Sequence, residues 1–260
     1  MDLNCLLLGW MMHFSELQTI VGNLDFIVAI GVAAAAGFMR GYVGVGSGML
    51  MAPVFAILFG PLETVVMVIL LDLAVTAQLL PSVYRLIEWR VVIPMGLAAA
   101  AFMPVGTWLL ITVDADLMAR GIALVVLIFV LLLMTGWRYQ REKRLGVTLS
   151  VGSLSGILVA ATSLGNPPVI LYLLSSSDTA ATNRANFTGY FAVTLITLLS
   201  MMIARDLVIP NAVVRAVIIL PVFALGAWIG TQYFRKSNDK TYRQVALGLL
   251  LCVAVFGFVR

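Results

Sequence analysis

The chain has 260 residues, of which 62% are hydrophobic and 11% are charged, and its formal net charge is +4. A typical soluble domain carries about 25% charged residues, so this composition, with a mean hydropathy of +1.07, indicates a polytopic membrane protein. No polar stretch is long enough for a separate soluble domain, which excludes an attached ATPase or an extramembrane enzyme domain. The basic residues are spread over loops and do not form a nucleic-acid-binding patch.

We interpret residues 1–260 as a single transmembrane domain that begins with an amphipathic segment at residues 1–23. Two repeats of five apolar segments follow, at residues 24–144 and 145–260. The segments expected in the first repeat are 24–43, 49–59, 63–83, 91–112 and 115–136. Those expected in the second repeat are 147–161, 167–175, 185–204, 213–234 and 242–258. The second segment of each repeat is too short to cross a bilayer at about 1.5 Å per residue, so we expect it to form a hairpin with the first.

A glycine-and-proline pattern marks the junction of the first two segments in both repeats. The first copy occupies residues 37–53 and the second residues 152–168, and two glycines and the final proline match at one offset (152 − 37 = 115). A later match, Gly106-Thr107 with Gly230-Thr231, has a larger offset (230 − 106 = 124). Helix-breaking residues at corresponding places in two halves of a membrane protein are typical of a transporter's binding site.

Loop charge predicts the orientation of the two repeats. The basic loops at residues 138–144 and 235–243 are expected in the cytoplasm, and the acidic loop at residues 114–116 is expected outside. If each hairpin adds no net crossing, the second repeat is inverted relative to the first. If each hairpin crosses twice, the repeats are parallel, and loop charge leaves both arrangements open. The fold class we predict is all-α, with two inverted repeats that each open with a glycine-broken helical hairpin.

The glycine breaks are the first candidate site. Unwound backbone frees N–H groups, and the short helix that follows begins with the positive end of its dipole near mid-membrane, which favours an anion. Glycines can also serve close helix packing, the interpretation we favour for the pairs at 37/41 and 152/156. The candidate substrate-binding residues in the breaks are Gly44, Gly46, Ser47, Gly48, Thr162, Ser163, Gly165 and Asn166.

Charged residues inside apolar segments complete the candidate site. Asp72 lies near the centre of its segment, where a charged group costs about 2.5–3.5 kcal/mol. It is either a proton-coupling group or a hydrogen-bonded carboxyl that joins helices. Arg40 either faces an anion, pairs with Asp72 or snorkels to the membrane surface. Arg184, close to the candidate Asn186, either binds the charge of the substrate or is an interfacial cation. With His13 as the single histidine, we expect no metal site and no catalytic histidine.

These motifs resemble those of the TauE/SafE sulfite-exporter family, also called TSUP or DUF81 permeases. The resemblance rests on Gly-x3-Gly-x2-Gly-x-Gly-x-Gly-x4-Pro from residue 37, and on Gly-x3-Gly from residue 152 followed by Gly165-Asn-Pro-Pro. Residues 88–94 and 183–188 look like further parts of the family pattern, and the resemblance covers residues 26–258. The chain departs from the pattern at Ser47, where many members carry glycine, and at Asn166-Pro167, where Gly-Gly-Pro is commoner.

The resemblance implies a duplicated, multi-pass carrier of the bacterial inner membrane and not an enzyme. We therefore expect a secondary transporter that exports sulfite or an organosulfonate such as sulfoacetate or taurine by alternating access, with Asp72 as the candidate for proton coupling. The alternative is a passive channel for a small anion or a neutral solute. The expected partners are the sulfur-containing substrate, membrane lipid and a second copy in a homodimer, with no nucleic acid and no cofactor.

Overall fold

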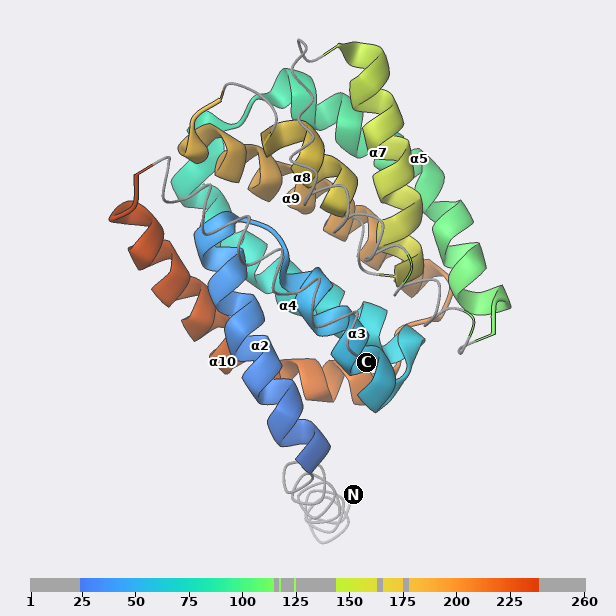
Figure 1. The fold of residues 1–260 in the computed structure, drawn as a ribbon. Coiled ribbons are helices and arrows are strands. Elements are labelled where there is room, and N and C mark those ends of the chain that lie inside the picture. The colour runs from blue at the N-terminus through green and yellow to red at the C-terminus, as the bar shows by residue number, and fades with distance from the viewer. Residues whose placement is uncertain are drawn as a thin grey trace, which may run out of the picture.

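The computed structural model describes residues 24–114, 117, 124, 144–162, 166–174 and 178–238. Within these ranges the chain is all-helical, with eight α-helices and one short 3-10 helix (Figure 1). In chain order they are α2 (Leu24–Val43), α3 (Ser47–Phe59), α4 (Pro61–Val83), η1 (Tyr84–Leu86), α5 (Trp89–Thr112), α7 (Leu145–Thr162), α8 (Asn166–Leu174), α9 (Ala180–Ala204) and α10 (Pro210–Arg235). The segments expected at 1–23, 115–136 and 242–258 lie outside the described residues, apart from Leu117 and Leu124.

Each of the other eight predicted segments is confirmed as a helix. Several begin a few residues before the apolar run that predicted them, because the helix starts in polar or proline-containing sequence. Pro61 and Pro210 open α4 and α10, where proline lacks only an N–H that would have no partner in the helix. Thr179 caps α9, since its side chain accepts a hydrogen bond from the Thr182 backbone N–H at 3.2 Å.

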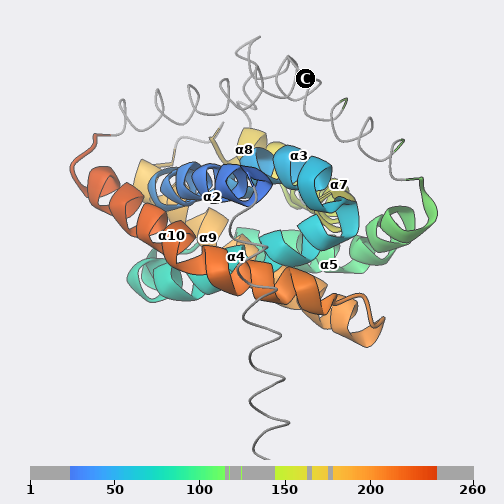
Figure 2. The same ribbon diagram turned by 90° about the horizontal axis from the view of Figure 1, so that it is seen from below.

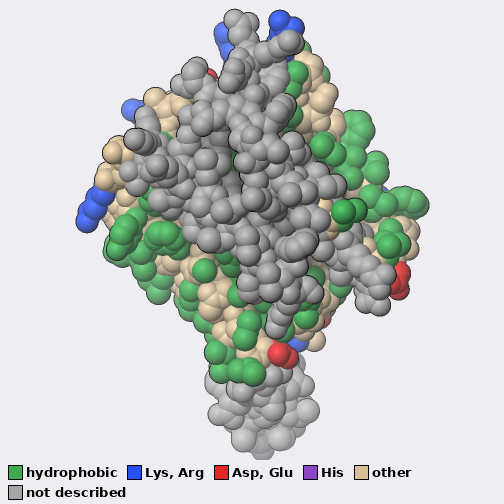
Figure 3. All heavy atoms as spheres, viewed as in Figure 1, with side chains coloured by type: hydrophobic (Ala, Val, Ile, Leu, Met, Phe, Trp, Pro, Cys, Tyr) green, Lys and Arg blue, Asp and Glu red, His purple; other side chains and the backbone are tan. Residues whose placement is uncertain are grey.

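Five of the described helices are long and apolar enough to cross a membrane: α2, α4 with η1, α5, α9 and α10. The 13 residues of α3 rise only about 20 Å, less than the roughly 30 Å of a bilayer's hydrocarbon core. Large apolar side chains such as Trp108 on α5 and Trp228 on α10 are exposed. Hydrophobic side chains cover much of the described surface in Figure 3, as expected of a protein that faces lipid.

The helices are arranged around a central pair, α4 and α9, which pack against each other. Figure 2 shows α2, α3, α7 and α8 gathered on one side of this pair, with α5 and α10 along the flanks. The contacts of these helices fall into two matching sets: α2 packs on α10 as α7 packs on α5, and α4 packs on α10 as α9 packs on α5.

Glycines allow α2 and α10 to approach closely. A Cβ added at Gly37 would collide with the backbone carbonyl of Phe223, and one added at Gly41 would collide with that of Ala227. The two contacts follow the same order along both helices, so α2 and α10 run parallel. Small residues that bring backbones together in this way are a common basis of helix association in membranes.

The contact between α7 and α5 has the same construction. A Cβ at Gly152 would collide with the backbone carbonyl of Met95, and one at Gly156 with that of Ala99. These helices also run parallel. The packing role predicted for the glycines at 37/41 and 152/156 is therefore confirmed: α2 packs against α10, and α7 packs against α5.

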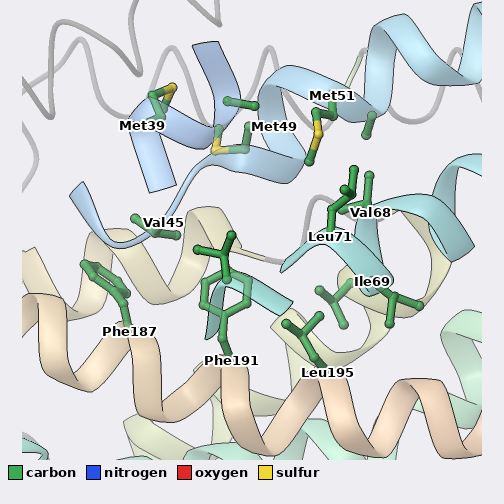
Figure 4. Close-up of a cluster of buried hydrophobic side chains, with 14 of the residues drawn as sticks. Met39, Val45, Met49, Met51, Val68, Ile69, Leu71, Phe187, Phe191 and Leu195 are labelled. Carbon is green, nitrogen blue, oxygen red and sulfur yellow. The ribbon is translucent and has the colours of Figure 1, made fainter. Parts of the chain in front are cut away.

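Buried side chains enclose the backbone between α2 and α3. Val45 lies in this connection and is fully buried, and Met39 and Met49 flank it on the two helices. Figure 4 shows Val45 facing Phe187 and Phe191 of α9. Irregular backbone is tolerated at membrane depth where protein covers it, and α9 provides that cover.

Two alanine substitutions on α2 test the glycine contact. Gly41→Ala should lower the free energy of unfolding by about 1–3 kcal/mol, because its methyl group must push the rigid backbone of α10 away. Gly31→Ala is the matched control, since nothing lies within 4 Å of a Cβ there and alanine is the better helix former. Thermal unfolding in detergent measures both. Equal stability of the two variants would contradict the close packing of α2 on α10.

Candidate functional site

The first break occupies residues 44–46, between the end of α2 at Val43 and the start of α3 at Ser47. Gly44 and Gly46 have φ of 87° and 101°, a left-handed conformation that glycine adopts without the steric cost of a Cβ. The break predicted at residues 44–48 is therefore shorter than expected, because Ser47 and Gly48 form the first turn of α3. An unbroken helix through this region is ruled out.

The second break lies between α7, which ends at Thr162, and α8, which begins at Asn166. The two are separate helices, as predicted. Ser163, Gly165 and the side chains of Thr162 and Asn166 lie outside the described part of the structure. Side-chain contacts at a break are therefore described for the first break.

Arg40 is fully buried on the last turn of α2 and contacts three other elements of the chain. One terminal nitrogen, Nη1, donates to the carbonyl of Gly44 in the break, and the other, Nη2, donates to Oγ1 of Thr76 on α4 at 2.7 Å. Its guanidinium carbon lies 3.8 Å from the centre of the Phe191 ring on α9. Its Nε lies 3.5 Å from Oδ1 of Asp72. Arg40 therefore pairs with Asp72 and does not snorkel.

Asp72 is 1% exposed and joins the start of α3 to α4. Its Oδ1 accepts a hydrogen bond from the Ser47 hydroxyl at 2.5 Å and is the same oxygen that faces Arg40. The Thr76 hydroxyl, one turn later, donates to the Asp72 backbone carbonyl at 2.6 Å. We call Arg40, Ser47, Asp72 and Thr76 the Arg40–Asp72 cluster. It connects the two helices on either side of the break to α4.

Arg184 lies on the other side of the break. It is 4% exposed, so it is buried in the protein and is not an interfacial cation. Its Nε and Nη2 donate to the carbonyl of Gly41 at 3.1 and 2.8 Å, and Nη2 donates to Oγ1 of Thr231 on α10 at 2.9 Å. A Cβ added at Gly44 would lie 2.9 Å from Arg184 Cγ. The Gly41 carbonyl belongs to the last turn of α2, which lacks partners within the helix, so Arg184 stabilises the negative end of the α2 dipole.

Asn186, on α9, forms two hydrogen bonds with Glu88, which lies just before α5. Its Nδ2 donates to Oε2 of Glu88, and its Oδ1 accepts from the Glu88 backbone N–H, both at 2.8 Å. Both ends of this amide therefore have protein partners. In this conformation Asn186 fixes the start of α5 against α9.

Four residues whose side chains contact the two arginines were not among the predicted site residues: Thr76, Phe191, Thr231 and Phe234. Thr76 could have been found from its position one turn after Asp72 on the same helix. Thr231 stood out in the sequence only as part of a repeated dipeptide. Nothing in the sequence separates the two phenylalanines from other residues of the core.

The arrangement consists of two buried guanidinium groups at an interrupted helix, with hydroxyl donors and the first turn of α3 beside them. Among the described residues, no group of three or more His, Cys, Asp or Glu side chains could hold a metal ion. Charge-assisted donors of this kind suit an oxyanion, because arginine presents several N–H groups in a fixed plane.

The family model described as Sulfite exporter TauE/SafE matches residues 29–257. The chain belongs to this family. The match includes both breaks and every residue of the Arg40–Asp72 cluster, and the family is one of membrane transporters. Together with five helices of membrane-spanning length, it makes this TauE/SafE protein a multi-pass membrane protein. Comparisons with curated proteins and with solved structures gave no match.

Double-mutant cycles on two ion pairs test how strongly this TauE/SafE protein depends on the buried one. Removing Arg40 or Asp72 alone, as Arg40→Gln or Asp72→Asn, should cost about 3–5 kcal/mol, because each leaves an uncompensated buried charge, and the double variant should recover part of that loss. The matched pair is Glu63 with Arg215, whose side chains are 20% and 22% exposed. Its coupling should stay below about 1 kcal/mol. Similar couplings in the two thermal-unfolding cycles would contradict a structural role for the buried pair.

Proposed function

We propose that this protein is a secondary transporter that exports a small sulfur-containing anion across the inner membrane by alternating access. The substrates proposed are sulfite and organosulfonates such as sulfoacetate or taurine. The observation that carries the proposal is a helix interrupted inside the protein, with buried Arg40 and Arg184 on its two sides, in a chain that belongs to a sulfite-exporter family.

The proposed substrate site extends over both breaks. The first turn of α3 supports it, because the N–H groups of a helix's first turn have no carbonyl partner within the helix. Arg40 supports it as well, since a guanidinium can bind two oxygens of a sulfonate as it binds two oxygens of a carboxylate or phosphate. The residues proposed to bind substrate are Arg40, Gly44, Gly46, Ser47, Gly48, Thr162, Ser163, Gly165, Asn166, Arg184 and Asn186.

We further propose that the two repeats are inverted relative to each other. Figure 1 shows α3 turning back from the end of α2 and α4 running back again, and the short turn after η1 reverses the chain into α5. By this path α5 runs opposite to α2. Because α10 is parallel to α2 and α7 is parallel to α5, α7 would run opposite to α2 and α10 opposite to α5. Rocking of one inverted repeat against the other is the usual basis of alternating access.

Arg40→Lys should lower the flux of labelled sulfite or sulfonate through proteoliposomes by about tenfold, equivalent to about 1.4 kcal/mol. Lysine keeps a positive charge beside Asp72 but lacks the planar, forked donors of arginine. Arg215→Lys is the control, because Arg215 lies at the partly exposed start of α10, paired with Glu63. Unchanged flux in Arg40→Lys would contradict the proposed site. Flux that rises linearly with concentration, without saturation or exchange, would favour a passive channel.

We assign proton coupling to Asp72. Protonation removes the negative charge of Asp72 from Arg40, so a lower pH on the side from which substrate loads should increase the flux. In Asp72→Asn the flux should no longer respond to an imposed pH gradient. Proteoliposomes with a preset pH difference measure this response. A response that persists unchanged in Asp72→Asn would place the coupling proton elsewhere.

A further inference from the structure

We propose that the Asp72 carboxylate is a tethered competitor, which occupies in the empty transporter the place that the transported anion takes when it binds. The inference rests on the proposed function and adds a role for Asp72 in setting the affinity of the site. On this view substrate binds by replacing one anion with another on Arg40 and Ser47.

The position of the carboxylate is the first argument. Asp72 Oδ1 accepts a hydrogen bond from the hydroxyl of Ser47 at 2.5 Å, and Ser47 is the first residue of the 13-residue helix α3. The same oxygen faces Arg40 Nε at 3.5 Å. A hydroxyl, a guanidinium and the start of a helix are the groups that a small oxyanion would seek here. In this conformation the hydroxyl and the guanidinium face a carboxylate that belongs to the protein.

The imperfect fit of Asp72 to Arg40 is the second argument. The Nε of Arg40 is buried and has no hydrogen-bond acceptor among the described residues. Each terminal nitrogen donates one hydrogen bond, to Gly44 and to Thr76, so Nε is the guanidinium nitrogen that has no acceptor among the described residues. Asp72 balances the charge of Arg40 without forming that hydrogen bond, since its carboxyl is held on α4. An anion that is not attached to α4 is free to take the position that Nε requires.

The other charged groups near α4 are engaged elsewhere. Arg184, on α9, donates to Gly41 and Thr231, and Arg215, on α10, pairs with Glu63. Within the described ranges, Arg40 is the cation within ion-pair distance of Asp72. An incoming anion and the charged carboxylate would therefore repel each other across one shared guanidinium. Binding of substrate must weaken when Asp72 is charged and in place.

Titration of purified full-length protein with methanesulfonate tests the competition, because this probe keeps its charge across the neutral pH range. Asp72→Asn keeps the shape of the side chain and an oxygen for Ser47 but loses the competing charge. It should bind the probe about tenfold more tightly than the unmodified protein. Glu63→Gln removes the charge of the other ion-paired carboxylate on α4 and should bind as the unmodified protein does. Calorimetry in detergent measures all three affinities.

Equal or weaker binding by a folded Asp72→Asn protein would overturn the inference, because removing a competing carboxylate cannot weaken the binding of methanesulfonate. Should Asp72→Asn fail to fold, infrared difference spectroscopy on the unmodified protein provides the test. Adding methanesulfonate should then change the carboxylate stretching bands, and an unchanged carboxylate region would overturn the inference. Failure of the proposed function would give a different result, since the unmodified protein would then neither bind nor transport any sulfite or sulfonate.

Discussion

Because α2 stops in the interior of the protein, the carbonyls at its end lack the N–H partners that a continuing helix would supply. Two buried arginines supply hydrogen-bond donors at this place. Arg184 donates to the Gly41 carbonyl and Arg40 donates to that of Gly44. Each arginine then needs a partner for its own charge or its remaining donors, which Asp72 and Thr231 provide. Unpaired backbone groups cost several kcal/mol in an apolar medium, so buried charge is here a consequence of interrupting a helix.

The glycine contacts decide where these groups are held. Gly41 belongs both to the packing of α2 on α10 and, through its carbonyl, to the binding of Arg184. Thr231, which also contacts Arg184, lies one turn after Ala227, the residue that Gly41 packs against. The close approach of two helix backbones therefore sets the distance between Arg184 and its acceptors. A substitution that alters the packing of α2 on α10 would therefore also change the hydrogen bonds of Arg184.

Sequence alone predicted the eight described helices because each contains an apolar run, although it placed some starts too late where a helix opens at a proline or after the capping threonine. It also located the break, since Gly44 and Gly46 permit a left-handed backbone that other residues avoid. It could not decide what Arg40 and Arg184 contact, because Thr76, Phe191 and the other partners beyond the break lie far away along the chain. Nor could it reveal that Asn186 bonds to Glu88, since the sequence around an asparagine in a helix does not indicate its hydrogen-bond partner.

The crossed glycine contacts have a consequence for how the molecule is assembled. α2 packs on α10, and α7 packs on α5, so each of these helices packs against the other half of the chain. A half expressed alone would therefore expose the glycine-containing faces of these helices to lipid. Because both halves belong to one chain, the two glycine contacts form within a single molecule and need no encounter between separate molecules.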